Sequence, residues 1–424
     1  MRSLLVLSFV SCLAFSLAAC SSPKAPTSAR GATTGISAQV DATAANDTAR
    51  GASQASETQE PEAEATVVSV TESTAEPQPG TEALLFQPFR EDFQTAPGQL
   101  SPYLQQWAEA LAQERNIPLP LIEGLLNQVR YDPQVIRLMT PAQGRAAKKS
   151  WSAYRERFVE QVRLQAGLKF WRSNEAEIAK VAEQYQIPAS VLVAIIGVET
   201  IFGQYIGDFK VLNTLANLGF SYPDARRPER AAMFRAQLAD FIELHHQEKL
   251  DANSARGSFA GAMGLPQFMP TSIKKWAIDA EDKGHVDLYG SIPDTLASVA
   301  NFLNHHGWQH DLPVFLTLPH QQPSLAQWVD GGLTPTLSWS DLQEAQITPD
   351  IDPQKGKEQQ FALIDLVDEV QGQTEFRLAT ANFFALTAYN RSYFYASAVA
   401  DFACALEQAF YRSTATCQLW RYPQ

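Results

Sequence analysis

Glu199 is the residue whose neighbours best suit it to donate a proton. It follows residues 191–198, a run of eight apolar residues, and precedes Thr200. Such a run predicts a buried helix, and at its carboxyl end both desolvation and the helix dipole disfavour the ionised form of a carboxylic acid. We therefore expect Glu199 to keep its proton to unusually high pH, as a general acid for glycosidic bonds must. The alternative is a glutamate that caps neighbouring amides or pairs with an arginine at the helix end.

Residues 256–270, with the sequence RGSFAGAMGLPQFMP, form a second segment suited to binding. The glycines permit close approach of a ligand to the backbone, Phe259 is one of several apolar platforms, and Ser258 and Gln267 supply hydrogen bonds. This mixture suits a sugar chain, and the spacing matches neither a P-loop nor a dinucleotide fingerprint. The alternative is a tight turn before a helix that begins near Thr271.

Tyrosines and an asparagine gather in residues 389–395, just before a predicted last helix at 395–410. The amide of Asn390 offers a donor and an acceptor to an N-acetyl group, and Tyr389 and Tyr395 can stack on pyranose faces. The alternative is a helix cap, in which Asn390 or Ser392 binds the first amides.

Metal and disulfide signals are weaker. The histidines at positions 305, 306 and 310 surround Trp308 without an HExxH motif, so we expect no metal there. Cys404 and Cys417 are compatible with a disulfide in an oxidising compartment, which spacing alone does not decide.

The elements that must position these residues are mostly helical. The patterns predict helices at 151–169, 175–185 and 190–200, and two short strands at 361–367 and 374–379 joined by a turn near Gly372. We place a small β-containing part at about 312–380, and the sequence has no internal repeat of the kind that solenoids and propellers show. The predicted fold class is therefore mainly α (α+β).

Composition excludes some partners. The chain has 424 residues, of which 45% are hydrophobic and 19% charged, as in globular proteins of two or three domains. Its 33 lysines and arginines face 46 aspartates and glutamates, for a net charge of −13. Binding to phosphate backbones has little electrostatic support, so we expect no nucleic acid partner.

The N-terminus predicts an exported and anchored protein. Residues 1–20 combine Arg2, an apolar stretch too short for a stable span and the sequence LAAC, and so resemble the signal peptide and lipobox of bacterial lipoproteins. That resemblance implies a lipid on Cys20, and Ser21 in place of aspartate implies the periplasmic face of the outer membrane. The alternative is an ordinary secretory signal.

Residues 21–85 predict a disordered tether. They contain no aromatic residue up to Leu85 and carry three basic against nine acidic residues, a balance of −6. Such a segment cannot bury enough apolar surface to offset its ordering entropy. As a random coil it would reach about 45 Å. The globular part is then residues 86–424.

Four motifs, in this order, resemble those of the membrane-bound lytic murein transglycosylase B family. They are Gly197-Val-Glu-Thr200, the glycine-rich loop 257–270, His306-Gly-Trp308 and Tyr389-Asn-Arg-Ser392. The resemblance covers about residues 86–424. It implies a lysozyme-like catalytic core with a helical N-terminal subdomain and a small β-containing subdomain, and it implies peptidoglycan strands as the partner.

The same resemblance implies roles for individual residues. Glu199 is then the only catalytic acid and base. The residues expected to line the glycan cleft are Tyr154, Ser258, Gln267, Tyr389, Asn390 and Tyr395, to which we add Phe259 from the loop. Met233 stands where relatives often have a second aromatic residue on the cleft wall.

A calcium loop of the family matches residues 279–294, with Asp279, Glu281 and Asp294 as ligands only if calcium binds. Lys283 stands where an acidic ligand is usual, which weakens such a site. We therefore expect no required cofactor and leave calcium open.

A single catalytic carboxylate predicts a reaction without water, since ordinary glycosidases need two carboxylates. Glu199 would protonate the oxygen between N-acetylmuramic acid and N-acetylglucosamine, then deprotonate the muramyl C6 hydroxyl, which closes a 1,6-anhydro ring. We regard Asp208, the nearest later carboxylate, as structural. Two alternatives are a lysozyme-type hydrolase and a lipoprotein that binds peptidoglycan without cleaving it.

Overall fold

The computed structural model describes residues 93–140, 148–318, 320–349, 351–414, 417 and 419–421. All of these residues belong to one compact unit. The predicted signal peptide (1–20), the predicted tether (21–85) and Cys20 lie outside the described residues.

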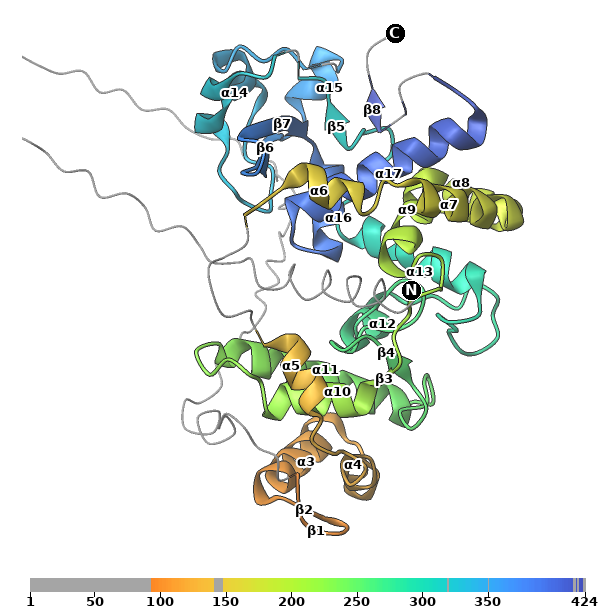
Figure 1. Cartoon of the computed structure of the whole chain (residues 1–424). Coiled ribbons are helices and arrows are strands. Elements are labelled where there is room, and N and C mark those ends of the chain that lie inside the picture. The colour runs from red at the N-terminus through yellow and green to blue at the C-terminus, as the bar shows by residue number, and fades with distance from the viewer. Residues whose placement is uncertain are drawn as a thin grey trace, which may run out of the picture. The chain divides into compact units, whose positions relative to one another are not determined.

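Helices dominate the chain (Figure 1), which confirms the predicted class. The first group of elements is β1 (Gln94–Ala96), β2 (Gln99–Leu100), α3 (Pro102–Arg115), α4 (Leu119–Leu126), α5 (Pro133–Met139), α10 (Val211–Phe220) and α11 (Pro228–His246). Their buried side chains form one apolar cluster, in which Leu104, Ile122 and Phe241 are fully buried. Proline is the first residue of α3, α5 and α11 and the second residue of α4, where its missing N–H costs no helical hydrogen bond.

A second core surrounds α9 (Ala189–Thr200), the helix that carries Glu199. Ten of its twelve residues are buried, as expected for a helix that is apolar on all sides. The helices that share this core are α6 (Trp151–Glu156), α7 (Gln161–Ser173), α8 (Glu175–Tyr185), α13 (Ile292–His305), α16 (Ala381–Tyr389) and α17 (Tyr393–Tyr411). Helix α12 (Pro270–Trp276) packs against both α11 and α13.

The prediction of one helix over 151–169 is wrong, because the chain breaks it into α6 and α7. Glu160 has an extended backbone with φ −129° and ψ 159°. Its carboxylate accepts the amides of Val162 and Arg163 at 2.6 and 2.7 Å. These bonds satisfy the free amides of a helix start, so a new helix begins at Gln161.

The β-containing part is a four-stranded sheet with the order β6-β7-β5-β8. The strands are β5 (Phe315–Leu316), β6 (Ala362–Asp368), β7 (Gln373–Ala379) and β8 (Trp420–Arg421). Strands β6 and β7 pair antiparallel from Ala362 opposite Ala379 to Asp368 opposite Gln373, which confirms the predicted hairpin. The short elements beside it are η1 (Pro323–Trp328), α14 (Trp339–Glu344) and α15 (Pro353–Lys357).

A buried ion pair joins this sheet to the helical core. Arg377 on β7 is 5% exposed and donates to both carboxylate oxygens of Asp401 on α17, at 2.8 and 3.1 Å. Arg155 on α6 donates to the same carboxylate at 2.5 Å.

Two further features bear on a disulfide and on membrane-spanning helices. Cys404 and Cys417 form a disulfide with Cα atoms 5.4 Å apart, which settles the question that spacing left open. Within the described ranges, no single helix is long and apolar enough to cross a membrane, and only the bent pair α8 and α9 passes by length and composition.

Candidate active site

Glu199 lies in the last turn of α9 and is partly exposed there. The hydroxyl of Tyr395 donates a hydrogen bond to its Oε1 at 2.6 Å. Burial raises the pKa of Glu199 to about 7, while the Tyr395 hydrogen bond and the charge of Arg163 act in the opposite direction. The elevated pKa agrees with the expectation from sequence, and it leaves a large fraction of the carboxyl protonated at neutral pH.

Tyr395 reaches Glu199 because α17 begins nearby. Ser392 caps this helix, and its hydroxyl accepts the amide of Tyr395 at 3.3 Å. The alternative proposed for this segment, a serine cap, is therefore present together with the tyrosine contact. Helix α17 packs directly on α9, so the start of one helix meets the end of the other.

The chain turns sharply just after Glu199. The φ values of Ile201, Phe202 and Gly203 are 50°, 57° and 87°. They lie in the left-handed region, which residues other than glycine rarely adopt. Thr200 holds this turn, since its hydroxyl bonds to Leu265 O at 3.3 Å and accepts the amide of Gly203 at 3.1 Å. The strained turn thus ends α9 directly after Glu199 and Thr200, and the bond from Thr200 attaches this helix end to the glycine-rich loop.

Gly197 is needed where α9 meets its neighbours. A Cβ at this position would lie 2.5 Å from the ring of Phe202 and 2.7 Å from the ring of Phe402 on α17. The first glycine of the Gly-Val-Glu-Thr motif is therefore a packing residue that lets Glu199 and Tyr395 approach each other.

The glycine-rich loop is held mainly by its own hydrogen bonds. Strand β4 (Arg256–Gly257) pairs with β3 (Phe209–Lys210) at its start. The hydroxyl of Ser258 accepts the amides of Ala260 and Ala262 at 3.3 and 3.1 Å. Gln267, with φ 50°, donates to Ile206 O and Gly264 O at 3.1 and 3.0 Å. Both residues thus shape the loop.

Phe259 occupies a different environment from the one expected. It is 3% exposed and packs in the first core, where its ring meets that of Phe209 at 6.5 Å. This position argues against direct contact with a sugar. Met233, which stands where relatives often have a second aromatic residue, packs against the same core.

Tyr389 joins the site from the end of α16. Its hydroxyl donates to Pro266 O at 2.6 Å, and its ring lies 6.4 Å from that of Tyr395 at an interplanar angle of 13°. Burial raises the pKa of both tyrosines well above 10, so both remain hydrogen-bond donors. Asn390, the next residue, is the C-cap of α16.

Tyr154 belongs to a neighbouring aromatic cluster. Its ring lies 5.2 Å from Phe158 and 5.4 Å from Phe394, the residue before Tyr395. Tyr154 also acts electrostatically on Tyr395. The structure therefore brings Glu199, Tyr395, Tyr389 and the loop together, with Tyr154 beside them.

Arg163 was missed by the sequence reasoning. It is 2% exposed, and its Nη1 donates to Gly197 O in the last turns of α9 at 2.5 Å. A signal existed: Arg163, Gly167, Leu168 and Trp171 are the buried residues of α7. Their helical spacing places an arginine on a core-facing stripe, where a charge needs a reason.

In the loop that resembles a calcium site, the carboxylates bind amides and side chains of the protein itself. Asp279 accepts the amides of Lys283 and Gly284 at 3.1 and 2.7 Å, and Asp294 accepts those of Ala280 and Asp287 at 2.9 and 2.8 Å. Glu281 binds the ammonium of Lys283 and the hydroxyl of Ser291. In the part of the chain that the structure describes, no three His, Cys, Asp or Glu side chains gather as metal ligands.

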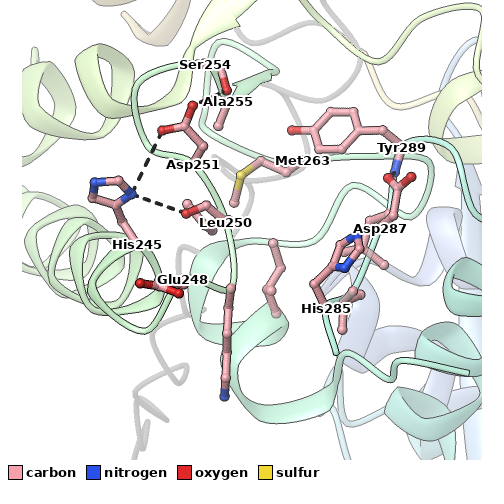
Figure 2. A pocket seen from close by; sticks show the side chains of 14 residues that line it. His245, Glu248, Leu250, Asp251, Ser254, Ala255, Met263, His285, Asp287 and Tyr289 are labelled. Atoms are coloured by element: carbon pink, nitrogen blue, oxygen red, sulfur yellow. Dashed lines mark hydrogen bonds and ion pairs between the residues drawn. The ribbon is translucent and has the colours of Figure 1, made fainter. Parts of the chain in front are cut away.

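A pocket of about 520 Å³ is lined by a separate set of residues (Figure 2). In it His245 lies 4.0 Å from Asp251, with Met263, His285 and Tyr289 also in the lining. None of the predicted site residues lines this pocket. Hydrogen bonds from Ser254 and Asn253 lower the pKa of Asp251, so this carboxylate is not suited to donate a proton. The acid chemistry therefore stays with Glu199.

Comparison with known proteins agrees with this geometry. Residues 99–404 match the family model described as transglycosylase SLT domain. Membrane-bound lytic murein transglycosylase B of Escherichia coli (strain K12) is 32% identical over 306 residues, which are 70% of this chain and 81% of that protein.

Solved structures give the same result. Soluble lytic transglycosylase SltB1 from Pseudomonas aeruginosa is 31% identical with a TM-score of 0.65, over 73% of this chain and 99% of that one. SltB3 from the same organism, solved in complex with NAG-anhNAM-pentapeptide, is 26% identical with a TM-score of 0.57, over 75% and 82%. The matched residues make up well over half of the chain, which therefore belongs to the transglycosylase SLT domain family.

Proposed function

We propose that this protein is a lytic transglycosylase of peptidoglycan, which cleaves the β-1,4 bond between N-acetylmuramic acid and N-acetylglucosamine and leaves 1,6-anhydromuramyl ends. Its role would be remodelling and turnover of the cell wall. The observation that carries this proposal is one half-buried glutamate whose carboxyl has a pKa of about 7 and is bound by Tyr395, inside the family's motif. The relative SltB3, whose complex contains an anhydro sugar with a pentapeptide, agrees with this chemistry.

In the first half of the reaction Glu199 acts as an acid. Tyr395 donates to Oε1, which leaves the proton of the carboxyl group on Oε2 for the glycosidic oxygen. The bond from that oxygen to the muramyl anomeric carbon breaks as the oxygen is protonated. The acetamido group of the substrate stabilises the positive anomeric carbon.

In the second half Glu199 acts as a base. Its carboxylate takes the proton of the muramyl C6 hydroxyl, and the C6 oxygen bonds to the anomeric carbon to close the anhydro ring. The Tyr395 hydrogen bond and the charge of Arg163 stabilise the carboxylate between the two halves. Glu199 is protonated again at the end of the cycle. No water is consumed, because the C6 hydroxyl is the nucleophile.

A second carboxylate is not needed in this scheme. Asp208, considered from sequence, has a 96% exposed side chain that pairs with Arg256 at 3.6 Å. We therefore keep it as a structural residue. We assign glycan contacts to Tyr154, Tyr389 and Asn390, and a supporting role in the loop to Ser258 and Gln267. Tyr395, which was also expected to line the cleft, is 3% exposed like Phe259, so we assign to it the hydrogen bond that holds Glu199.

We also propose that the protein is a lipoprotein of the outer membrane, held by Cys20 at the periplasmic face. The LAAC sequence before Ser21 supports this location. The relative in Escherichia coli is named membrane-bound, which agrees with an anchor.

Mass spectrometry of muropeptides released from purified sacculi tests the function. The protein is used in the form that lacks residues 1–20. We expect anhydromuramyl products from this form, none from its Glu199→Gln variant, and unchanged products from the control Asp208→Asn. Reducing ends would identify a hydrolase instead. Sacculi that bind the protein but release nothing would identify a non-catalytic tether.

A further inference from the structure

A buried arginine contacts the helix end that carries Glu199. Helices α7, α9 and α17 pack together (Figure 1), and Arg163 on α7 lies inside this contact with 2% of its surface exposed. Its Nη1 donates to Gly197 O at 2.5 Å, and its Nη2 donates to Arg157 O at 3.3 Å. The guanidinium also lies 5.2 Å from the ring centre of Phe158.

The position of Arg163 places a positive charge at the carboxyl end of α9. The carboxyl end of a helix carries partial negative charge from its free carbonyls, and Gly197 O is two residues from Glu199. This negative end and burial both favour the protonated carboxyl. A guanidinium stays charged throughout the accessible pH range, so Arg163 opposes both effects at every working pH.

We propose that Arg163 is a positioning residue for the reaction. Its buried guanidinium holds the end of α9 in place and supplies a fixed positive charge that stabilises the carboxylate form of Glu199. The proposal rests on the proposed function for its catalytic meaning. Without this charge Glu199 would remain an acid but would form its carboxylate less readily, and a group that must do both works best when neither form is strongly favoured.

The other groups around Glu199 define the background. Tyr395 from α17 donates to its carboxyl, and Tyr389 at the end of α16 stacks near Tyr395. Helices α8 and α13 also pack on α9 and contribute apolar side chains to the shared core. Thr200 links the helix end to the loop through an uncharged hydroxyl. Arg163 is thus the cation that acts on Glu199 among the described residues.

Carbon-13 NMR of glutamate carboxyls tests the proposal directly. The resonance absent from Glu199→Gln reports the titration of Glu199. Arg163→Gln keeps a donor for Gly197 O but no charge, Arg163→Met keeps neither, and Arg163→Lys keeps the charge. We expect the midpoint to rise by roughly half to one pH unit in the two neutral variants and to stay near the wild-type value in Arg163→Lys. The alkaline limb of sacculus cleavage should move with it.

Arg377→Met is the matched control, since Arg377 is also buried and paired but belongs to the sheet contact. It should lower the melting temperature without moving the midpoint. An unmoved midpoint in a folded neutral variant would overturn the proposal, as would an equal rise in Arg163→Lys. If neither neutral variant folds, Arg163 is a structural residue and the proposal falls. Cleavage by Glu199→Gln would overturn the proposed function, while the NMR midpoint would still judge Arg163.

Discussion

Glu199 experiences opposing effects, and their balance suits a group that works as both acid and base. Burial raises its pKa, whereas Tyr395 and Arg163 lower it, and the result is about 7. Both protonation states are therefore populated near neutral pH. Above that range the acid form becomes scarce, so cleavage should slow as pH rises through about 7.

The raised pKa also predicts how stability depends on pH. The pKa of about 7 in the folded protein exceeds the ordinary value of 4.5 that applies to the unfolded chain, so the folded state binds the proton more tightly. The stabilisation is fully present below about 4.5 and is lost as pH rises through about 7. Glu199→Gln, which is always neutral, should therefore gain stability relative to wild type between pH 5 and pH 8, by at most about 3 kcal/mol. Thermal unfolding at both pH values measures the gain.

Asp208→Asn is the control for this measurement, because its side chain is 96% exposed. Its stability difference from wild type should change little with pH. A Glu199→Gln difference that is equally flat would contradict the raised pKa.

Residue-level prediction from sequence succeeded where the cause is local. The apolar run before Glu199 was enough to predict burial and an elevated pKa. The partner Tyr395 lies 196 residues away, so no local pattern could indicate its hydrogen bond. Phe259 was predicted to be a sugar platform because it is an aromatic residue in a glycine-rich loop with hydrogen-bonding side chains, yet that loop turns its ring into the core.

At the scale of elements, Gly257 holds the start of the loop by close backbone contact. A Cβ there would lie 2.2 Å from Ala262 O, a backbone atom that cannot move aside cheaply. We expect Gly257→Ala to lose roughly 1 to 3 kcal/mol of stability and most cleavage activity, because the loop that carries Ser258 and Gln267 must shift.

Gly124→Ala is the matched control, since no atom lies within 4 Å of a Cβ in the middle of α4. Alanine should stabilise that helix by about 0.5 to 1 kcal/mol and leave activity intact. Chemical denaturation of both variants provides the comparison. Unchanged stability in Gly257→Ala would show that the loop has more freedom than the structure indicates.

The loop 279–294 uses a lysine where its relatives are expected to use an acid. The ammonium of Lys283 binds Glu281 and attracts Asp294 and Asp287. We therefore expect millimolar calcium, or its removal by a chelator, to leave the melting temperature unchanged. Lys283→Asp removes the internal cation and adds a ligand, so calcium should raise its melting temperature.

Lys180→Asp makes the same charge change on the exposed face of α8 and should not respond to calcium. Calcium-dependent stabilisation of the wild type would contradict the role given to Lys283.

Elements were predictable where both ends carry local signals. Helix α8 spans the predicted 175–185, and the hairpin follows apolar strands around Gly372, whose φ of 66° suits a turn. The break between α6 and α7 was missed because Glu160 is a good helix former by type. Its capping role depends on the side chain reaching back to Val162 and Arg163.

At the scale of the whole molecule, every group of the proposed site lies between Tyr154 and Tyr395, inside one compact unit that holds all the described residues. These groups come from both ends of that stretch, since α6 and α9 lie early and α16 and α17 lie late. The sheet inserted between them is tied back by Arg377 and Asp401. Catalysis should therefore depend on the folded unit as a whole but not on the segments before it.

Separation of anchoring from catalysis is the prediction that follows. Cys20→Ala, and a chain that starts at residue 86, should both leave the membrane fraction, because each lacks the proposed lipid. Both should cleave isolated sacculi at the wild-type rate and melt at the wild-type temperature, because every residue that we assign to the site lies between Tyr154 and Tyr395. Cell fractionation, muropeptide release and thermal unfolding measure the three quantities on the same proteins. A membrane-bound Cys20→Ala protein would refute the anchor, whereas slow cleavage by the shortened chain would show that the tether takes part in binding the glycan.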